Sequence, residues 1–291
     1  RLSMEDWNAG VIWKLPGRVL GFPRRPLVMG IVNVNDDSFS GDGTLETGAA
    51  LARAKRQAEE GADLIDVGAE SARTNREAVT VAEEVRRFRD FLERWPEVIA
   101  GAVPNDAEQV WPPVLSANTW RPEVAEAVLP LGVELLNDMG GLPDDRNARL
   151  CAEAGAALLI MHSVGEPKVP HFHQRWDDVM AAMEAFFDAK IALAVNAGLP
   201  REALVLDPVF ASGRGDEFAG EDMVSAIREL LVPQSTVVTP NIAELRRLAA
   251  DDDEDANLAE CAQRLLDTGC EYVLVTGTHD STPEVINTLY H

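Results

Sequence analysis

The sequence predicts an α/β protein with a (β/α)8, TIM-barrel-like fold. Short apolar runs rich in β-branched residues occur eight times along the 291 residues. Stretches with helical periodicity lie between most of these runs, as parallel strands joined by crossover helices require. The runs are almost continuously apolar, which indicates strands that are covered on both faces. An open, doubly wound sheet is the alternative, because eight strands do not by themselves require a closed barrel.

The expected elements follow one another in a regular order. Helical periodicity is clearest at residues 45–60, 78–95 and 176–197, and shorter helices are expected at 217–231 and 257–268. Several helices should end at a glycine, the residue that most easily takes the left-handed conformation there: Gly61, Gly132, Gly155, Gly198 and Gly269. The eight strands are predicted at residues 27–34, 63–68, 113–118, 133–138, 157–162, 204–208, 236–240 and 272–277.

Polar residues stand at the end of every predicted strand. In barrels of this type the chemistry lies at the carboxyl ends of the strands, so eight polar ends predict a shared polar mouth. The alternative is that strand ends simply turn into solvent. The residues concerned are Asn33, Asp66, Asn118, Asn137 with Asp138, His162, Asp207, Asn241 and His279.

The composition argues against two classes of partner. Acidic residues outnumber basic ones 49 to 26, giving a net charge of −23, and such a surface repels the phosphates of nucleic acids. No apolar run reaches the roughly eighteen residues that a membrane helix needs, so no membrane contact is expected. The three cysteines show no metal-binding spacing and are interpreted as reduced thiols of a cytoplasmic protein.

The first motif with chemical content is MGIVNVNDDSFSGDG at residues 29–43. A strand ends at Asn33, and the loop after it is crowded with side-chain oxygens. An asparagine carbonyl at this place is a suitable ligand for Mg²⁺, which prefers oxygen and keeps several waters. The alternative is an ordinary turn between strand and helix. The string closely resembles the N-terminal signature of the dihydropteroate synthase family.

Further strings similar to that family follow in the same order. They are ADLIDVGAESAR at 62–73, PVLSANTWRPEVAEAVLPLGVELLNDMGGL at 113–142, LLIMHSVGEPK at 158–168, and the long helix with its following strand at 176–208. Arg73 matches the arginine of the family's second loop. The resemblance covers about residues 20–208 and implies a pterin-binding barrel.

The resemblance also implies how a pterin ring would be held. The matching positions are Asn118, Asn137 and Asp207, with Met161 packing against the ring. A carboxylate such as Asp207 can accept two N–H bonds from the ring edge. The family has an aspartate where this chain has Asn118, and an amide offers an NH₂ group to a ring edge that also donates. We therefore expect Asn118 to weaken pterin binding.

The last third of the chain resembles another family. The strings DPVFASGRGD, LLVPQSTVVTPNIAE and VLVTGTHD, within about residues 204–291, are similar to the middle of hydroxymethylpyrimidine/phosphomethylpyrimidine kinases of thiamine biosynthesis, which have a ribokinase-like fold. The remaining parts of such a kinase are missing, so kinase activity is not expected. We expect residues 1–208 to form the pterin-binding barrel part, and residues 209–291 to complete the barrel or be appended to it.

Together these resemblances imply a transferase of folate biosynthesis. It would join 6-hydroxymethyl-7,8-dihydropterin diphosphate to p-aminobenzoate, with Mg²⁺ as cofactor on Asn33 and with Asn33, Arg73 and His279 as catalytic residues. His279 takes the place of a family histidine if the strands at 236–240 and 272–277 are the seventh and eighth of the barrel. A homodimer is also implied. The alternatives are a pterin-binding protein without catalysis and an inactive remnant of the kinase.

Overall fold

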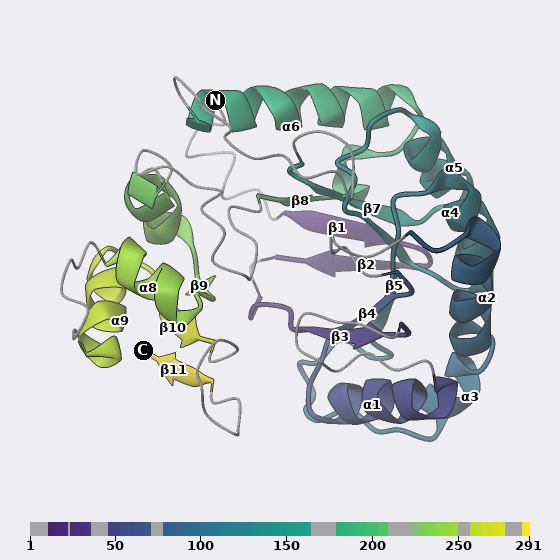
Figure 1. Ribbon diagram of the computed structural model, residues 1–291, viewed down its shortest axis with the longest axis horizontal. Coiled ribbons are helices and arrows are strands. Elements are labelled where there is room, and N and C mark those ends of the chain that lie inside the picture. The colour runs from purple at the N-terminus through teal and green to yellow at the C-terminus, as the bar shows by residue number, and fades with distance from the viewer. Residues whose placement is uncertain are drawn as a thin grey trace. The chain divides into compact units, whose positions relative to one another are not determined.

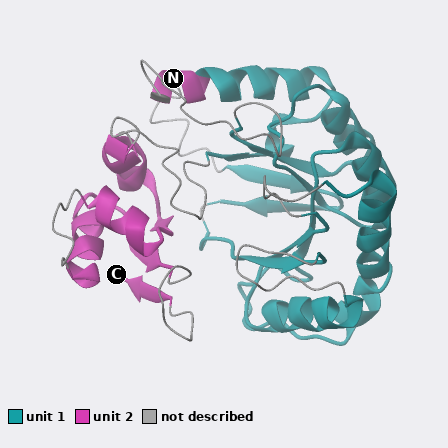
Figure 2. Ribbon diagram, in the orientation of Figure 1, with its two compact units in different colours: residues 1–171, 185–209 teal, residues 172–184, 210–291 magenta. Residues whose placement is uncertain are grey.

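The computed structural model describes residues 11–22, 24–35, 46–70, 78–163, 179–208, 224–225, 227–249, 257–276 and 287–291. The chain divides into two compact units (Figure 2). Unit 1 comprises residues 1–171 and 185–209, and unit 2 comprises residues 172–184 and 210–291. In the described part of the chain, no helix is both long enough and apolar enough to cross a membrane.

Unit 1 is built on a parallel sheet of six strands (Figure 1). The order of the strands in the sheet is their order in the sequence, as in a barrel, whereas a doubly wound sheet reverses its order at a switch point. The predicted α/β, TIM-barrel-like fold is therefore confirmed. The strands are β3 (Met29–Asn33), β4 (Leu64–Gly68), β5 (Val114–Asn118), β6 (Leu135–Asp138), β7 (Ala157–Met161) and β8 (Leu204–Asp207).

Helices connect these strands and line the outer side of the sheet (Figure 1). Local sequence sets several of their ends: the Thr80 hydroxyl accepts the backbone N–H of Glu83 at 3.2 Å where α2 begins, and Gly155 ends α5 with a φ of 69°. The helices of the barrel part are α1 (Thr47–Glu59), α2 (Val81–Leu92), α3 (Trp95–Ala100), α4 (Pro122–Val128), α5 (Arg146–Ala154) and α6 (Val179–Asn196), with single turns η1 (Leu129–Leu131) and η2 (Arg201–Ala203).

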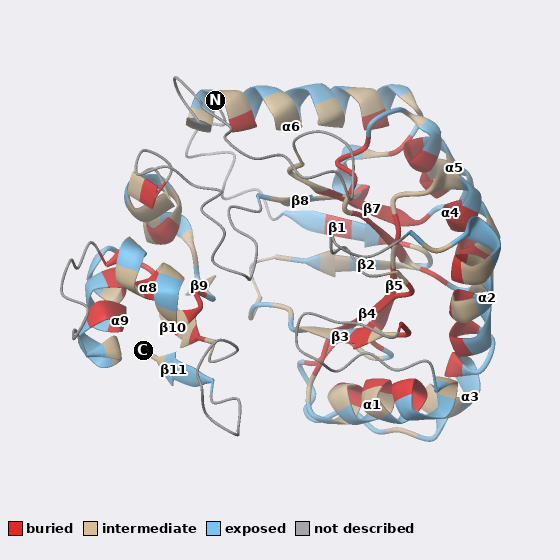
Figure 3. Cartoon of the chain, viewed as in Figure 1, coloured by how far each residue is buried: buried red, intermediate tan, exposed pale blue. Residues whose placement is uncertain are grey.

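The core of unit 1 lies between the sheet and these helices (Figure 3). All five residues of β4 are buried, as the uninterrupted apolar run predicts for a strand covered on both faces. Phe88, Phe91 and Leu92 of α2 are fully buried against the sheet. The strands that carry polar end residues are thus held in a rigid, close-packed scaffold.

An N-terminal hairpin, which the sequence analysis did not foresee, packs on the same core. Its strands are β1 (Ile12–Leu15) and β2 (Arg18–Gly21), and Trp13 and Leu15 are buried. Arg18 donates to Glu134 at 2.6 and 2.8 Å and to the carbonyl of Pro112 at 2.7 Å. Glu134 directly precedes β6, and Pro112 lies two residues before β5. The hairpin therefore contacts the amino ends of these strands, opposite the carboxyl edge.

Unit 2 has its own small sheet and core. Strands β9 (Val237–Val238), β10 (Tyr272–Val275) and β11 (Thr288–Tyr290) form the sheet, and β10 lies between the other two. Helix α8 (Ile242–Leu248) begins with a capping box in which Asn241 and Glu244 bond reciprocally. The other elements are η3 (Ile227–Leu231), η4 (Val232–Gln234) and α9 (Leu258–Asp267), the last of which confirms the helix expected at 257–268.

The last two predicted strands lie in the sheet of unit 2, and closure of the barrel by these strands stays a prediction. β10 pairs in parallel with β9 and antiparallel with β11, and β3 pairs with β4 alone among the described strands. Strand β11, at residues 288–290, was not predicted from the sequence. It pairs antiparallel with β10 on the edge opposite β9.

Candidate functional site

The strand register places the predicted binding residues on one face of the sheet. Asn33, Gly68, Asn118 and Asn137 form one row across β3, β4, β5 and β6. The row continues through Leu159 and Val205, and two residues further along those strands lie Met161 and Asp207. Side chains alternate between faces along a strand. Asn33, Asn118, Asn137, Met161 and Asp207 therefore project from the same face, at the carboxyl edge.

A buried carboxylate, Asp66 of β4, joins two of these residues. One of its oxygens, Oδ2, accepts the side-chain N–H groups of Asn118 and Asn137, both at 3.2 Å. The other, Oδ1, accepts the hydroxyl of Ser116 at 2.5 Å. Asp66 is only 3% exposed, and this burial raises its pKa, while the three hydrogen bonds act in the opposite direction. On the sequence alone, Asp66 is only a polar residue at a strand end and is not assigned to the binding residues.

Gly68 makes room in the middle of this row. A Cβ atom at that position would lie 3.3 Å from the amide oxygen of Asn33 and 3.9 Å from Cβ of Asn118. The missing side chain thus lets Asn33 and Asn118 approach each other over β4. The amide oxygen of Asn33 consequently lies over the strand rather than out in solvent.

Asp207 at the end of β8 is a half-buried carboxylate. Burial raises its pKa, with no hydrogen bond to lower it again. Within the described residues its carboxylate has no hydrogen-bond partner. Met161, its partner in the register, lies beside it on β7. A partly desolvated carboxylate without a protein partner, next to an apolar side chain, is typical of a binding site for a ligand with N–H groups.

Not every polar strand end belongs to this face. His162 follows Met161 by one residue and therefore points to the helix side, where its ring lies edge-on to Phe186 of α6 with centroids 4.8 Å apart. The expectation that His162 shares the polar mouth is thus wrong. Asn241 caps a helix, as described above. Arg73 and His279, the other predicted catalytic residues, lie outside the described residues.

A second buried cluster, which was not predicted from the sequence, involves Glu70, the last described residue before the segment that contains Arg73. Arg121 bridges the carboxylates of Glu70 and Glu84, whose side chains are 2% and 1% exposed. Glu70 also accepts the backbone N–H of Val79 at 3.0 Å. The cluster therefore holds together two residues, Glu70 and Val79, that are nine positions apart in the sequence.

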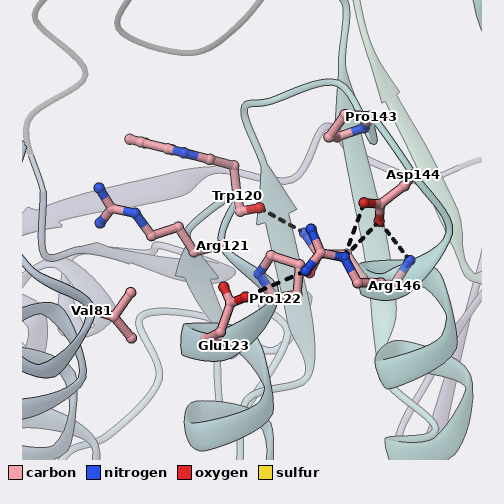
Figure 4. Close-up of a pocket in the computed structure, with 9 residues that line it drawn as sticks. Val81, Trp120, Arg121, Pro122, Glu123, Pro143, Asp144 and Arg146 are labelled. Carbon is pink, nitrogen blue, oxygen red and sulfur yellow. Dashed lines mark hydrogen bonds and ion pairs between the residues drawn. The ribbon is translucent and has the colours of Figure 1, made fainter.

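A pocket of about 430 Å³ lies over the loops that follow β5 and β6 (Figure 4). Arg146 in its wall contacts Asp144 at 3.0 Å and Glu123 at 3.3 Å, so this cation is already paired. None of the predicted site residues lines the pocket. The lining residues are Val81, Trp120, Arg121, Pro122, Glu123, Pro143, Asp144, Arg146 and Asn147.

The described residues offer limited ligands for a metal. In the ranges given above, no three His, Cys, Asp or Glu side chains are grouped so as to hold an ion. Asn33 contributes an amide oxygen at the carboxyl edge. Mg²⁺ usually takes one or two protein oxygens and completes its shell with waters and substrate phosphates. A single amide oxygen therefore fits Mg²⁺ that arrives with a phosphorylated substrate.

The fold and site together define the class as an α/β, TIM-barrel-like protein with a polar candidate site at the carboxyl edge of its strands. Residues 29–275 match the family model described as pterin binding enzyme. The match covers well over half of the chain, and the chain therefore belongs to the pterin binding enzyme family.

Named relatives are dihydropteroate synthases. The chain is 33% identical over 208 residues to the dihydropteroate synthase of Neisseria meningitidis serogroup B, covering 70% of this chain and 68% of that protein. It is 36% identical over 198 residues to a probable bifunctional folylpolyglutamate synthase/dihydropteroate synthase of Halobacterium salinarum, covering 67% of this chain and 23% of that longer protein. The solved Xanthomonas albilineans dihydropteroate synthase with 4-aminobenzoic acid is 28% identical, with a TM-score of 0.62 and 92% of each chain covered.

Proposed function

We propose that this protein is a transferase of the dihydropteroate synthase type, which joins 6-hydroxymethyl-7,8-dihydropterin diphosphate to p-aminobenzoate with loss of diphosphate. The observation that carries the proposal is the half-buried Asp207 carboxylate, which lies without a partner among the described residues on the same face as Asn118 and Asn137. The family match and the dihydropteroate synthase relatives support it.

The pterin ring would lie against this face. Asp207 would accept two ring N–H groups, Asn118 and Asn137 would bind the same polar edge, and Met161 would pack against the ring. The strands hold these groups in place before the ligand arrives, which lowers the entropic cost of aligning the reactants. Exclusion of water by the ring strengthens each of these hydrogen bonds.

The diphosphate end of the substrate would lie toward Asn33. When bound there, Mg²⁺ would neutralise charge that develops on the departing diphosphate. Asn33 would hold the ion through its amide oxygen. Arg73 and His279 are proposed as the other residues at this end, on the resemblance alone, and the amine of p-aminobenzoate would attack the ring-bound methylene carbon.

A pterin-binding protein without catalysis is the second candidate. Gly277 stands where the synthase family has an arginine, and the sequence offers no evident counterpart of the family's phosphate-binding lysine. The kinase-like origin of residues 209–291 also stays a proposal. The family match runs through residue 275, across the boundary between the two resemblances, and this favours a synthase role for that part of the chain.

Two measurements on one preparation test the proposal. Calorimetric titration with 6-hydroxymethyl-7,8-dihydropterin measures binding, and a phosphate-coupled assay measures diphosphate release from the pterin diphosphate with and without p-aminobenzoate. Release that depends on p-aminobenzoate and Mg²⁺ supports the transferase. Binding without release supports the second candidate, and absence of binding contradicts both.

The remaining partners are proposals of the same kind. Two copies of the chain are proposed to form a homodimer, which light scattering at micromolar concentration would detect as twice the 31.7 kDa chain mass. A cytoplasmic location, without nucleic-acid or membrane partners, stays a prediction from the composition.

A further inference from the structure

We propose that Asp66 is a positioning residue that orients the amides of Asn118 and Asn137 so that their carbonyl oxygens face the ligand. Asn118 then presents an acceptor at the place where the family has a carboxylate. This inference rests on the proposed function, because the ligand concerned is the pterin ring. It adds a residue that neither the resemblance nor the sequence pattern assigned to the site.

The orientation follows from the chemistry of the contact. Oδ2 of Asp66 lies 3.2 Å from each amide nitrogen. An ionised carboxylate only accepts hydrogen bonds, so an amide turned the other way would press its carbonyl oxygen against a negative oxygen. The NH₂ group of each asparagine must therefore face Asp66. The carbonyl oxygen, at the opposite end of each planar amide, then points away from Asp66.

Neither carbonyl oxygen is used elsewhere in the described part of the chain. Asn118 and Asn137 each make their recorded side-chain hydrogen bond through Nδ2, and no described donor reaches Oδ1 of either residue. Asn118 is half-buried at the carboxyl edge, so its oxygen remains available to a ligand. Two acceptors thus stand side by side on neighbouring strands.

Asp66 itself is held rigidly. It belongs to a strand in which every residue is buried, and the fully buried hydroxyl of Ser116 donates to its Oδ1 at 2.5 Å. Ser116 is the neighbour of Asp66 in the register, and Asn118 and Asn137 lie two residues further along their strands, on the same face. The Asp66 carboxylate is therefore fixed in place, and it affects ligand binding through the orientation of the Asn118 and Asn137 amides.

This arrangement changes the expected contribution of Asn118 to ligand specificity. On sequence alone, its NH₂ group was expected to meet a ring donor and to weaken binding. In the structure Asp66 takes up that NH₂ group, so Asn118 acts as an acceptor. The site then selects rings that carry adjacent N–H donors, as a 2-amino-pyrimidinone edge does, and it rejects rings with acceptors there because opposed acceptors would stay unpaired.

Two substitutions at one position separate positioning from general structural support. Asp66→Ala removes the acceptor and frees both amides to turn, so the Kd for 6-hydroxymethyl-7,8-dihydropterin should rise about ten- to a hundredfold. Asp66→Asn keeps one carbonyl acceptor, and Ser116 can rotate its hydroxyl to accept from the new NH₂ group. Binding by Asp66→Asn should therefore stay within about threefold of the wild-type protein, which is rescue by the conservative variant.

Asp138→Ala is the matched control. Asp138 is another buried aspartate of the same sheet, and it too accepts an asparagine amide, from Asn147 at 2.9 Å, but on the helix side. Its substitution should leave the pterin Kd within about threefold of wild type, although it lowers the thermal midpoint. A loss of pterin affinity in Asp66→Ala that greatly exceeds the loss in Asp138→Ala supports positioning.

Three results would overturn the inference. The first is pterin binding by Asp66→Ala within threefold of wild type, and the second is equal loss in Asp66→Ala and Asp66→Asn. The third result comes from NMR of the ligand-free wild-type protein. The side-chain amide protons of Asn118 and Asn137 should exchange more slowly than those of the exposed Asn196. Equal exchange rates would contradict the orientation even if Asp66→Ala does not fold. A wild-type protein that shows slow exchange but binds no pterin would instead contradict the proposed function.

Discussion

Asn137 and Asp138 are consecutive residues at the end of β6, and their side chains lie on opposite faces of the sheet. Asn137 donates to Asp66 on the face of the candidate site. Asp138 points to the helix side, where it accepts the backbone N–H of Gly140 at 2.8 Å and the amide of Asn147 in α5 at 2.9 Å. Asn137 therefore belongs to the candidate site, and Asp138 stabilises the turn that follows β6.

The buried position of Asp138 predicts a pH-dependent stability. Burial raises its pKa from 3.8 to about 6, despite the hydrogen bonds from Asn147, Gly140 and Leu142. The folded protein therefore holds this proton more tightly than the unfolded chain does. The stability that protonated Asp138 contributes is fully present below pH 4 and is lost as the pH rises through 6. The free energy of unfolding should fall by roughly 3 kcal/mol over this range.

Denaturant unfolding of the wild-type protein and of Asp138→Asn between pH 4 and 7.5 checks this prediction. The variant cannot titrate at position 138, so the difference between the two free energies of unfolding isolates this group. The wild type should lose stability relative to the variant as the pH rises from 4 to 7. A difference that does not change with pH would show that Asp138 is not desolvated as described.

Much of the fold could be predicted from the sequence. All eight predicted strands exist, because each is a compact apolar run bounded by turn residues. Gly132 and Gly155, expected at helix ends, have φ values of 92° and 69°. The shared face of Asn118, Asn137 and Asp207 also follows, since their places at strand ends and the parallel order determine it.

The remaining errors concern partners that are far apart in sequence. The strand that pairs with β10 depends on which of several strand edges binds it best, and local sequence does not determine this. The short segment Thr288–Tyr290 also has no clear alternation of apolar and polar residues that would predict a strand. His162 was misplaced because a one-residue difference in where a strand ends reverses the face of the side chain. Asp66 was not assigned to the site because its role depends on Ser116, 50 residues away.

The cluster of Arg121 with Glu70 and Glu84 predicts a large effect of one substitution. Arg121→Met keeps a long apolar stem but removes the cation that bridges these two buried carboxylates. Uncompensated buried charge is costly, so the free energy of unfolding at pH 7.5 should fall by about 3–5 kcal/mol. Urea denaturation, monitored by circular dichroism, measures this change in the free energy of unfolding.

Arg149→Met is the matched control for this experiment. Arg149 pairs with Asp145 on the exposed surface of α5, where the two side chains are 62% and 34% exposed. Solvent and salt screen such a pair, so its removal should change the stability little. Similar losses in Arg121→Met and Arg149→Met would mean that the buried cluster contributes no more than an ordinary surface pair.

The excess of acidic residues predicts stabilisation by salt. With a net charge of −23, the folded chain repels itself, and the repulsion is stronger in the compact state than in the expanded one. Raising KCl from 0.1 to 1 M shortens the screening length from about 10 to about 3 Å. The thermal midpoint should therefore rise by several degrees. Equal effects of KCl and NaCl would identify screening as the cause, and a midpoint that falls with salt would contradict it.

Asp207 offers the sharpest test of the binding face, because one substitution should move affinity and stability in different directions. Asp207→Asn removes a half-buried charge whose pKa burial has raised, so the thermal midpoint at pH 7.5 should stay the same or rise. The new amide offers one acceptor and places a donor against the ring donors, so the pterin Kd should rise about ten- to a hundredfold. Asp188→Asn, on the exposed side of α6, is the control and should change neither quantity. Unchanged pterin affinity in Asp207→Asn would exclude this carboxylate from the ring contact, and a lower midpoint would mean that it has a structural partner instead.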